Sequence, residues 1–319
     1  MSDQIIGTRH AEGSARQAIR QAALRLPLLS PLLRQRSLRY RMRGALGYEP
    51  DLEHPITFNE KIGWRILYDR NPLLAATTDK IAVRDYVARR VGPDILIPLL
   101  GTWRSAADIP WQALPERFVL KANHGWNMNL LVRDKAGLDL GAAAARAAGW
   151  LRHSHYEDTG EWAYRDIVPR LLAEEMLLDE RGEIPADLKF YVFNGRMRLL
   201  QVHTGRHGAH RITTFDEGLR RLPLRQTHGT DADYVLPPQV PGMIPLAERL
   251  GAEFDFARVD LYCVRGRAWF GEITHYDGGG CAAFEPAHYD RVIGEMWRRP
   301  KGEGFRLGPL ARLDRRLLG

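Results

Sequence analysis

Cysteine and long apolar runs are scarce in this sequence. Two cysteines, Cys263 and Cys281, occur among 319 residues, too few for a disulfide framework or a cysteine-rich zinc site, which favours a reducing cytoplasm. No segment approaches the roughly 18–20 uninterrupted apolar residues of a membrane helix. Arg20, Arg25 and Pro27 interrupt the start of the chain before a signal-peptide core could form. We therefore expect a soluble cytoplasmic globular protein.

Internal repeats and the glycine-rich motifs of Walker and Rossmann sites are also missing, so any nucleotide must be held in another way. Hydrophobic residues make up 45% and charged residues 27% of the chain, which excludes a wholly disordered or fibrous protein. Because 319 residues exceed the usual size of one hydrophobic core, we expect two or three packed subdomains.

The net charge of +7 is concentrated at the two ends of the chain. Residues 1–50 contain nine arginines against three acids, and residues 297–319 contain seven basic residues against two acids. An anionic partner would therefore meet the termini. The leucines within residues 14–45 predict a helix that either docks on the body or lies on an anionic membrane surface. Nucleic acid is not expected, because the basic runs carry no recognition motif.

Capping and turn signals predict an α+β fold with mainly antiparallel sheet in the second half. Thr57 and Glu60 form a capping box that begins a helix over 57–68. Further helices are expected at 79–91, 140–156 and 246–250, and strands at 118–121, 171–177, 188–193, 197–202 and 211–215. The last unit is a hairpin of 259–264 and 268–274, closed by residues 265–267.

The hairpin is the most informative feature of the sequence. Its expected register places Asp260 opposite Glu272, with Thr274 beside Glu272 on the same face. Opposed like charges destabilise a sheet unless a cation lies between them, and Mg²⁺ favours one or two carboxylates together with substrate phosphates. In the alternative interpretation, Arg258 or another basic residue neutralises a structural acid pair, or the register slips.

Two lysines are candidates for binding phosphate. Lys121 ends an apolar strand just before an Asn-His-Gly turn, where it could reach either a phosphate or solvent. Lys80 begins the second predicted helix, where a cation is unfavourable for the helix dipole. This unfavourable position is a weak indication that the lysine is present because of a contact outside the helix.

Acids on neighbouring strands are candidates for binding polar groups of a ligand. Glu174 and Glu175 occur within an apolar strand, and Asp187 and Lys189 share one face of the next strand. Carboxylates in these positions could accept hydrogen bonds from a ribose or an amino group, or could simply be solvated.

Three further patterns are weaker. Asp231-Ala232-Asp233 has the D-x-D form by which many glycosyltransferases hold a metal, but such short patterns arise often by chance. His203 and His207 have the spacing of a helical zinc site, although nearby glycines argue against a helix. With Arg206 and Arg211 this segment could bind an anion or be a solvated basic loop.

The order of these motifs along the chain is more specific than any one of them. The first half contains Phe58-Asn59-Glu60-Lys61, Asp79-Lys80 and Phe118-Val119-Leu120-Lys121; the second contains Ala173-Glu174-Glu175, Asp187-Leu188-Lys189-Phe190, Arg258-Val259-Asp260 and Glu272-Ile273-Thr274. Over about residues 55–295 this set resembles the ATP-grasp superfamily. More narrowly it resembles the TupA-like branch, which is named for teichuronopeptide synthesis and found among cell-surface polysaccharide genes.

The resemblance implies two mainly antiparallel α+β subdomains that sandwich the nucleotide. On this basis the chain divides into a basic helical extension (1–50), an N-terminal helical lobe (51–115), a small subdomain (116–186), a catalytic subdomain (187–296) and a basic C-terminal tail (297–319).

The resemblance also implies a role for each candidate residue. Lys80 and Lys121 would hold the phosphates, and the 123–126 loop would cover them. The nucleotide-binding set implied in this way is Lys80, Lys121, His124, Gly125, Glu174, Glu175, Met176, Leu177, Asp187 and Lys189. Asp260, Glu272 and Thr274 would hold Mg²⁺, with threonine where most of the superfamily has asparagine. Arg206, Arg211 and Arg258 would stabilise the transferred phosphoryl group or bind the acceptor carboxylate.

The implied function is a Mg·ATP-dependent carboxylate–amine ligase with an acyl-phosphate intermediate, acting on a glycan or peptide precursor in surface-polymer biosynthesis. Three alternatives stay open on the sequence alone: a kinase on the same fold, a glycosyltransferase using the D-x-D pattern, and an ATP-binding scaffold without turnover. We expect a cytoplasmic location, with peripheral contact to the inner face of the membrane through the basic ends as an open alternative.

Overall fold

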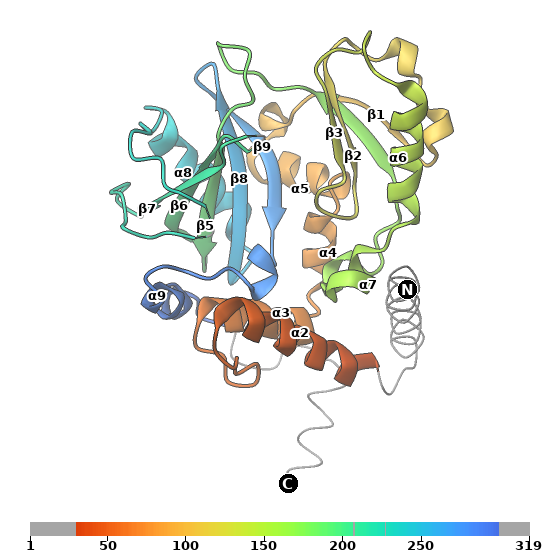
Figure 1. Cartoon of the computed structure of the whole chain (residues 1–319). Helices are drawn as coiled ribbons and strands as arrows, with labels where there is room; N and C mark the ends of the chain where they lie inside the picture. The colour runs from red at the N-terminus through yellow and green to blue at the C-terminus, as the bar shows by residue number, and fades with distance from the viewer. Residues whose placement is uncertain (1–29, 207, 227, 300–319) are drawn as a thin grey trace, which may run out of the picture.

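The computed structural model describes residues 30–206, 208–226 and 228–299, which form two antiparallel sheets with helices around them (Figure 1). Most of the two predicted basic ends, residues 1–29 and 300–319, and with them the predicted membrane contact, lies outside the described residues. Within the described part of the chain, no helix has the length and apolar composition that crossing a bilayer requires.

The smaller sheet has four strands in the order β1-β4-β2-β3. Alternate residues of β2, such as Phe118 and Leu120, are fully buried, as expected for a strand with one face in a core. They pack with helix α6 and the loops beside it in a hydrophobic core of their own. The bounds are β1 Leu99–Trp103, β2 Phe118–Ala122, β3 Asn129–Val132, β4 Leu171–Glu175 and α6 Leu140–Arg152.

The larger sheet has five strands in the order β7-β6-β5-β8-β9, each pair antiparallel. One face carries apolar residues such as Phe190 and Val259 and packs against helix α8, in a second core that is separate from the first. The opposite face is rich in charged side chains. The bounds are β5 Asp187–Phe193, β6 Arg196–Thr204, β7 Arg211–Asp216, β8 Phe256–Val264, β9 Arg267–Thr274 and α8 Val240–Gly251.

Helices α2, α3 and α9 lie together beneath the larger sheet (Figure 1). The predicted capping box is confirmed: the Thr57 hydroxyl accepts from the Glu60 amide, and the Glu60 carboxylate accepts from the Thr57 amide at 3.0 Å. The remaining helices are α2 Ser30–Leu46, α3 Phe58–Tyr68, α4 Pro72–Thr78, α5 Ala82–Val91, α7 His155–Thr159 and α9 His288–Met296, with short 3₁₀ turns η1 Pro93–Ile95, η2 Ala106–Asp108, η3 Trp111–Ala113, η4 Trp162–Tyr164 and η5 Asp277–Gly280.

The hairpin of β8 and β9 differs from its prediction in two ways that cancel. The turn has two residues, Arg265 and Gly266, both with positive φ, because Val264 pairs with Arg267. That turn alone would shift the register by one, but a bulge at Gly271 restores it, and Asp260 lies opposite Glu272 as predicted. A Cβ at position 271 would lie 3.0 Å from the Asp260 carbonyl oxygen, so glycine permits the bulge.

Two helices and two strands also differ from the prediction. The helix predicted from residue 79 begins at Ala82, so Lys80 lies in the turn between α4 and α5 and its conflict with a helix dipole does not arise. The helix predicted over 140–156 divides into α6 and α7. Strands β1 and β3 were not predicted, because each is short and carries little alternation.

Candidate functional site

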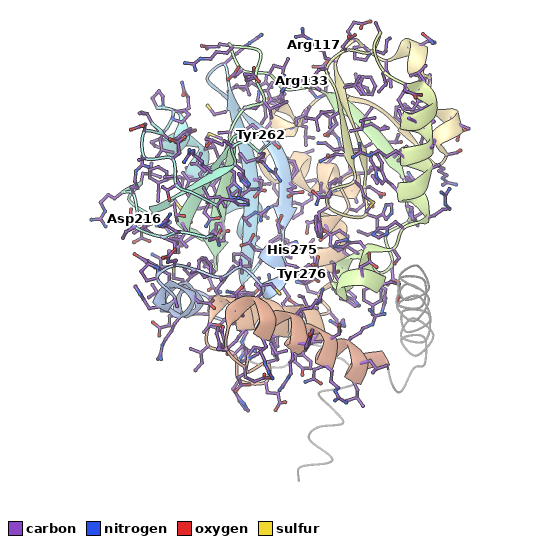
Figure 2. All side chains as sticks on the ribbon, in the orientation of Figure 1. Arg117, Arg133, Asp216, Tyr262, His275 and Tyr276 are labelled. Carbon is purple, nitrogen blue, oxygen red and sulfur yellow. The ribbon has the colours of Figure 1, made fainter. Side chains whose placement is uncertain are left out.

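The charged face of the larger sheet and the facing side of the smaller sheet enclose a pocket of about 560 Å³. Lys121 from the smaller sheet and Asp187, Arg258 and Glu272 from the larger sheet line it. Figure 2 labels Tyr262 toward one end of this face and Tyr276 near the other. The structure therefore brings most of the predicted site residues together from segments that are far apart in the sequence.

On the smaller sheet, Lys121 and Glu174 form an ion pair. The Lys121 Nζ lies 2.7 Å from one Glu174 oxygen, and the Arg84 guanidinium lies 2.8 Å from the other. The Glu174 side chain is 10% exposed, so both cations bind a carboxylate that is largely removed from water. Lys121 reaches the pocket from this pair, whereas Glu174 does not line it.

Lys80 lies beside Lys121 in the pocket wall. Its Nζ donates to the Gly125 carbonyl oxygen at 2.7 Å, and its amide donates to the Asn123 carbonyl oxygen at 3.2 Å, so it fixes the 123–125 turn. Burial lowers the pKa of Lys80, and the charge of Lys121 adds to this effect while Glu272 opposes it. Two ammonium groups side by side form a cationic wall that suits an anion.

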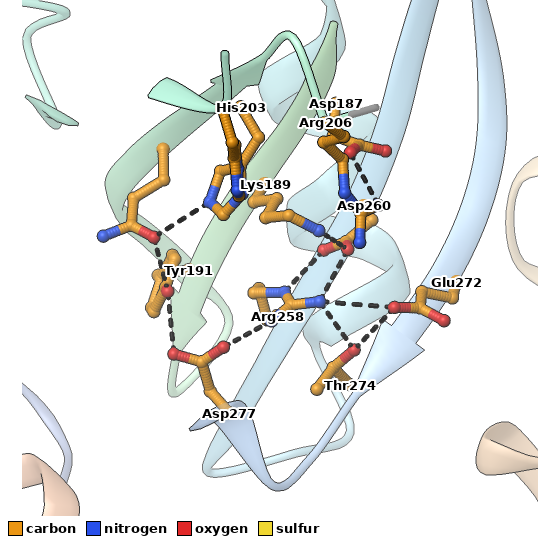
Figure 3. Close-up of polar contacts among 12 residues, drawn as sticks. Asp187, Lys189, Tyr191, His203, Arg206, Arg258, Asp260, Glu272, Thr274 and Asp277 are labelled. Atoms are coloured by element: carbon orange, nitrogen blue, oxygen red, sulfur yellow. Dashed lines mark hydrogen bonds and ion pairs between the residues drawn. The ribbon is translucent and has the colours of Figure 1, made fainter. Parts of the chain in front are cut away.

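Arg258 is the centre of a polar cluster on the larger sheet (Figure 3). Its Nε and one terminal nitrogen each donate to an Asp260 oxygen at 2.7 Å. The same terminal nitrogen donates to the Thr274 hydroxyl at 3.0 Å and to Glu272 at 3.3 Å, and the other binds Asp277. The alternative weighed from the sequence, in which Arg258 neutralises the opposed acids, is therefore the arrangement observed in this structure.

The acids of the cluster differ in exposure. The Asp260 side chain is 4% exposed and also binds the ammonium of Lys189, whereas the Glu272 side chain is 40% exposed and faces the pocket. Burial acts to raise the pKa of Glu272, but the positive charges of Lys80, Arg258 and Lys189 lower it below its usual value. Glu272 is thus an ionised carboxylate at neutral pH that a second cation could reach.

Asp187 lies at the far end of the pocket with Arg206. The Arg206 guanidinium donates to Asp187 at 2.8 Å. Burial acts to raise the pKa of Asp187, but the charges of Lys189 and Arg206 and a hydrogen bond from Tyr262 lower it. Asp187 is therefore an ionised acceptor, as a contact to ligand hydroxyls would require.

Several predicted residues do not line the pocket. His124 points away from it, toward the carbonyl oxygens of Trp150 and His153 at 3.1 and 3.2 Å. Arg211 is exposed and donates to the Thr230 carbonyl oxygen at 3.4 Å. Others outside the lining are Glu175, Met176, Leu177 and Lys189, of which Lys189 joins the site through Asp260.

Two of the three weaker sequence patterns have local structural roles or lie partly outside the described residues. The Asp231 carboxylate accepts from the Asp233 amide at 3.3 Å and from Thr204 at 3.4 Å, so it closes its own loop. His203 contacts His210, with 3.1 Å between ring nitrogens, and His207 lies outside the described residues. No group of three or more metal-binding side chains occurs among the residues that the structure describes.

Asp277 and Tyr191 were missed from the sequence. Asp277 binds Arg258 from the turn after β9, and the Tyr191 hydroxyl donates to it at 2.8 Å. Asp277 precedes three glycines that all have positive φ, and this D-G-G-G run is the signal that could have indicated a tight turn at the site.

Asp260 and Glu272 fit a magnesium ion in the chemistry of their oxygens. Both are hard donors on adjacent strands, and the Arg258 guanidinium already lies between them as a cation. Mg²⁺ commonly takes one or two carboxylates and completes its coordination with phosphate oxygens and water. Two acids therefore suffice when a phosphorylated ligand is present, and Thr274 supplies a neutral hydroxyl beside Glu272.

Comparisons with known proteins agree with the order of motifs. The family model described as TupA-like ATPgrasp matches residues 60–298. A search of curated proteins found no match.

Solved structures give weaker similarities. D-alanine–D-alanine ligase from Bacillus anthracis complexed with ATP is 14% identical, with 70% of this chain and 65% of that chain covered and a TM-score of 0.40. N5-carboxyaminoimidazole synthase from Aspergillus clavatus is 12% identical, with 70% and 47% covered and a TM-score of 0.36. The ATP-grasp ligase PsnB with Mg and ADP is 12% identical, with 64% and 51% covered and a TM-score of 0.34. The chain thus covers less than two thirds of each of these proteins, and the likenesses are too weak to carry an argument.

Proposed function

Because the chain belongs to the TupA-like ATP-grasp family, as the match over residues 60–298 shows, we propose that it is a Mg·ATP-dependent carboxylate–amine ligase. The predicted fold and the predicted enzyme class, an ATP-grasp ligase, follow from this membership. The reaction, the metal and the role of each residue are the proposal.

One observation carries the proposal. Lys80 and Lys121 present two ammonium groups to the same pocket that Glu272 and Arg258 enter from the opposite sheet. A polyphosphate between the sheets would meet cations on one wall and, through Mg²⁺ held by Asp260 and Glu272, a further cation on the other. Charge neutralisation of this kind is the main contribution that a protein makes to phosphoryl transfer.

The remaining pocket residues fit parts of the same ligand. Asp187, ionised and at the far end of the pocket, would accept hydrogen bonds from the ribose hydroxyls, which its position in the lining supports. Arg258 would bind the transferred phosphoryl group, which is supported by the position of its guanidinium between Asp260 and Glu272, the acids proposed to hold the metal. Mg²⁺, when bound, would offset charge on the phosphates.

The proposed reaction has two steps. A carboxylate oxygen of one substrate attacks the γ-phosphorus of ATP, which forms an acyl phosphate and releases ADP. An amine then attacks the acyl carbon, the C–N bond forms, and the C–O bond to phosphate breaks. For the substrates we propose a glycan or peptide precursor of a surface polymer, supported only by the family branch.

The first test is whether Mg·ATP stabilises the protein through this site. Ligand at about 100 times Kd stabilises by about 2.7 kcal/mol, and we expect a magnesium-dependent rise in Tm that Glu272→Gln abolishes. Glu217→Gln is the matched control, because Glu217 is exposed and pairs with Arg198 away from the pocket. The proposed nucleotide site is wrong if Mg·ATP causes no rise in Tm in the parent or if Glu272→Gln keeps the full rise.

The second test separates a ligase from a kinase. Carboxylates and amines from surface-polymer precursors are supplied in pairs, and the carboxylate is labelled with ¹⁸O. A ligase releases ADP and phosphate in equal amounts and transfers one ¹⁸O from the carboxylate to the phosphate. ADP without free phosphate, together with a product that has gained a phosphoryl group, would assign a kinase instead.

A further inference from the structure

The pocket extends past the Arg258 cluster to a second end that the nucleotide contacts proposed above leave unused. Helix α2, the segment from α7 to η4, and the glycine turn after β9 enclose this end. Its lining residues include Arg41, Trp126, Glu161, Tyr164, Tyr276 and Gly279. Figure 2 labels Tyr276 at this lower end of the larger sheet.

Glu161 is the feature that points to a ligand. Its side chain is 8% exposed, yet it lines the pocket. Within the described residues its carboxylate has one partner, the His155 ring nitrogen at a long 3.4 Å. A buried carboxylate ordinarily accepts several hydrogen bonds, so most of its capacity to accept is left for a ligand. The other Glu161 oxygen lies on the side of Gly279. A Cβ built on residue 279 would lie 3.7 Å from this oxygen, so the glycine leaves space beside it.

Aromatic rings line this end of the pocket beside the carboxylate. The His155 and Tyr164 rings are 4.4 Å apart, and Trp126, which is 56% exposed, meets His155 edge-on at 5.7 Å. A carboxylate near aromatic rings is suited to an ammonium group, which pairs with the carboxylate and can be attracted to a ring. The cation Arg41 is held away by the Thr159 carbonyl oxygen at 2.8 Å and forms no ion pair with Glu161 among the described residues.

The two ends of the pocket therefore differ in how their charges are paired. Lysines and arginines together with carboxylates line the end proposed for ATP, whereas at the other end Glu161 is a buried acid without an arginine or lysine partner among the described residues. Tyr164 lies between them: burial, and then the negative charges of Glu161 and Glu272, raise its pKa. A group bound at Glu161 would thus share the pocket with the acids proposed to hold Mg²⁺.

We propose that Glu161 binds the amine substrate as an ammonium ion and accepts its proton. The inference rests on the ligase function proposed above. One ammonium proton passes to a Glu161 oxygen, and the freed lone pair forms the C–N bond as the acyl C–O bond to phosphate breaks. The departing phosphate takes the second nitrogen proton, the amide keeps the third, and Glu161 returns its proton to solvent.

The test uses methylammonium as the probe and Cys281 as the reporter. Cys281 lines the same end of the pocket. Burial raises the pKa of its thiol, the charge of Arg41 acts to lower it, and the charge of Glu161 acts to raise it. We expect methylammonium chloride, compared with sodium chloride at equal ionic strength, to slow the alkylation of Cys281 by iodoacetamide several-fold in the full-length protein. Mass spectrometry of the labelled peptide distinguishes Cys281 from Cys263.

Glu161→Gln should abolish this protection, and Glu157→Gln should keep it. Glu157 lies on the same segment but is 46% exposed and pairs with Arg34. Glu161→Gln should also leave Tm unchanged or raise it, because the buried charge that it removes has one side-chain partner among the described residues, the His155 ring at a long 3.4 Å. Equal protection in both variants, or a Glu161→Gln protein that is less stable or unfolded, would assign Glu161 to the fold and overturn the inference.

The Mg·ATP shift in Tm keeps the two proposals separate. If the shift is present in the parent and in Glu161→Gln while methylammonium protection does not depend on Glu161, the amine site fails and the nucleotide site stands. If the parent shows no Mg·ATP shift, the ligase function itself fails.

Discussion

Replacing Arg258 by methionine tests the polar cluster most directly. The guanidinium is 12% exposed and contacts Asp260, Glu272, Thr274 and Asp277. Removing it leaves Asp260 with Lys189 and Asp277 with Tyr191 as their remaining side-chain partners in the cluster. Breaking a buried ion pair by removing one partner costs about 3–5 kcal/mol, and we expect Arg258→Met to destabilise the protein by this amount.

The assay is urea unfolding in EDTA, with the shift in Tm as a second measure. At about 2–4 °C per kcal/mol the loss corresponds to roughly 6–20 °C. Adding Mg²⁺ should restore more stability in Arg258→Met than in the parent, because the acids then lack their competing cation. Arg211→Met is the control: Arg211 is exposed, and the change should stay within about 0.5 kcal/mol. An Arg258→Met protein within about 1 kcal/mol of the parent would refute this account of the cluster.

Three further predictions concern other parts of the chain. Burial lowers the pKa of His203 far below its usual value, so only the unfolded state gains a proton at this residue as pH falls below about 6.5, and the free energy of unfolding should fall by up to about 1.4 kcal/mol per pH unit. His203→Gln should reduce this pH dependence in urea unfolding at pH 7.5, 6.5 and 5.5. An unchanged pH dependence in the variant would contradict the prediction. Asp231→Ala should leave the Mg·ATP shift in Tm intact. Loss of the shift in this variant would show that the D-x-D pattern takes part in binding Mg·ATP. Gly294→Ala should destabilise by about 1–3 kcal/mol, since its Cβ would lie 2.2 Å from the Ile56 carbonyl oxygen; a parent-like urea midpoint would show that α9 can move away from α3.

Local signals predicted the elements well where one short segment contained all the information. The capping box at Thr57 and Glu60 needs only four neighbouring residues, and it was predicted correctly. The pairing of Asp260 with Glu272 was also correct, although it results from a shorter turn and a compensating bulge at Gly271. A bulge depends on contacts between neighbouring strands, and the alternation of apolar and polar residues within one strand does not predict it.

The candidate site was predictable only in part, because its contacts join distant segments. Lys80, Lys121, Asp187, Arg258 and Glu272 do line one pocket. Local sequence could not indicate that the His124 ring turns toward the end of α6, because that orientation depends on carbonyl groups 26 and 29 residues away. Asp277 and Glu161 were missed for the same reason.

The two sheets have separate hydrophobic cores, and the pocket between them is lined largely by charged and polar side chains. Apolar contacts make folding cooperative, so we expect two cooperative units of different stability in place of one. In native-state hydrogen exchange, amides of β2 and β4 should share one opening free energy, and amides of β5 and β8 another. A nucleotide bound between the sheets would couple the two units, and the difference between their exchange rates should narrow when Mg·ATP is added.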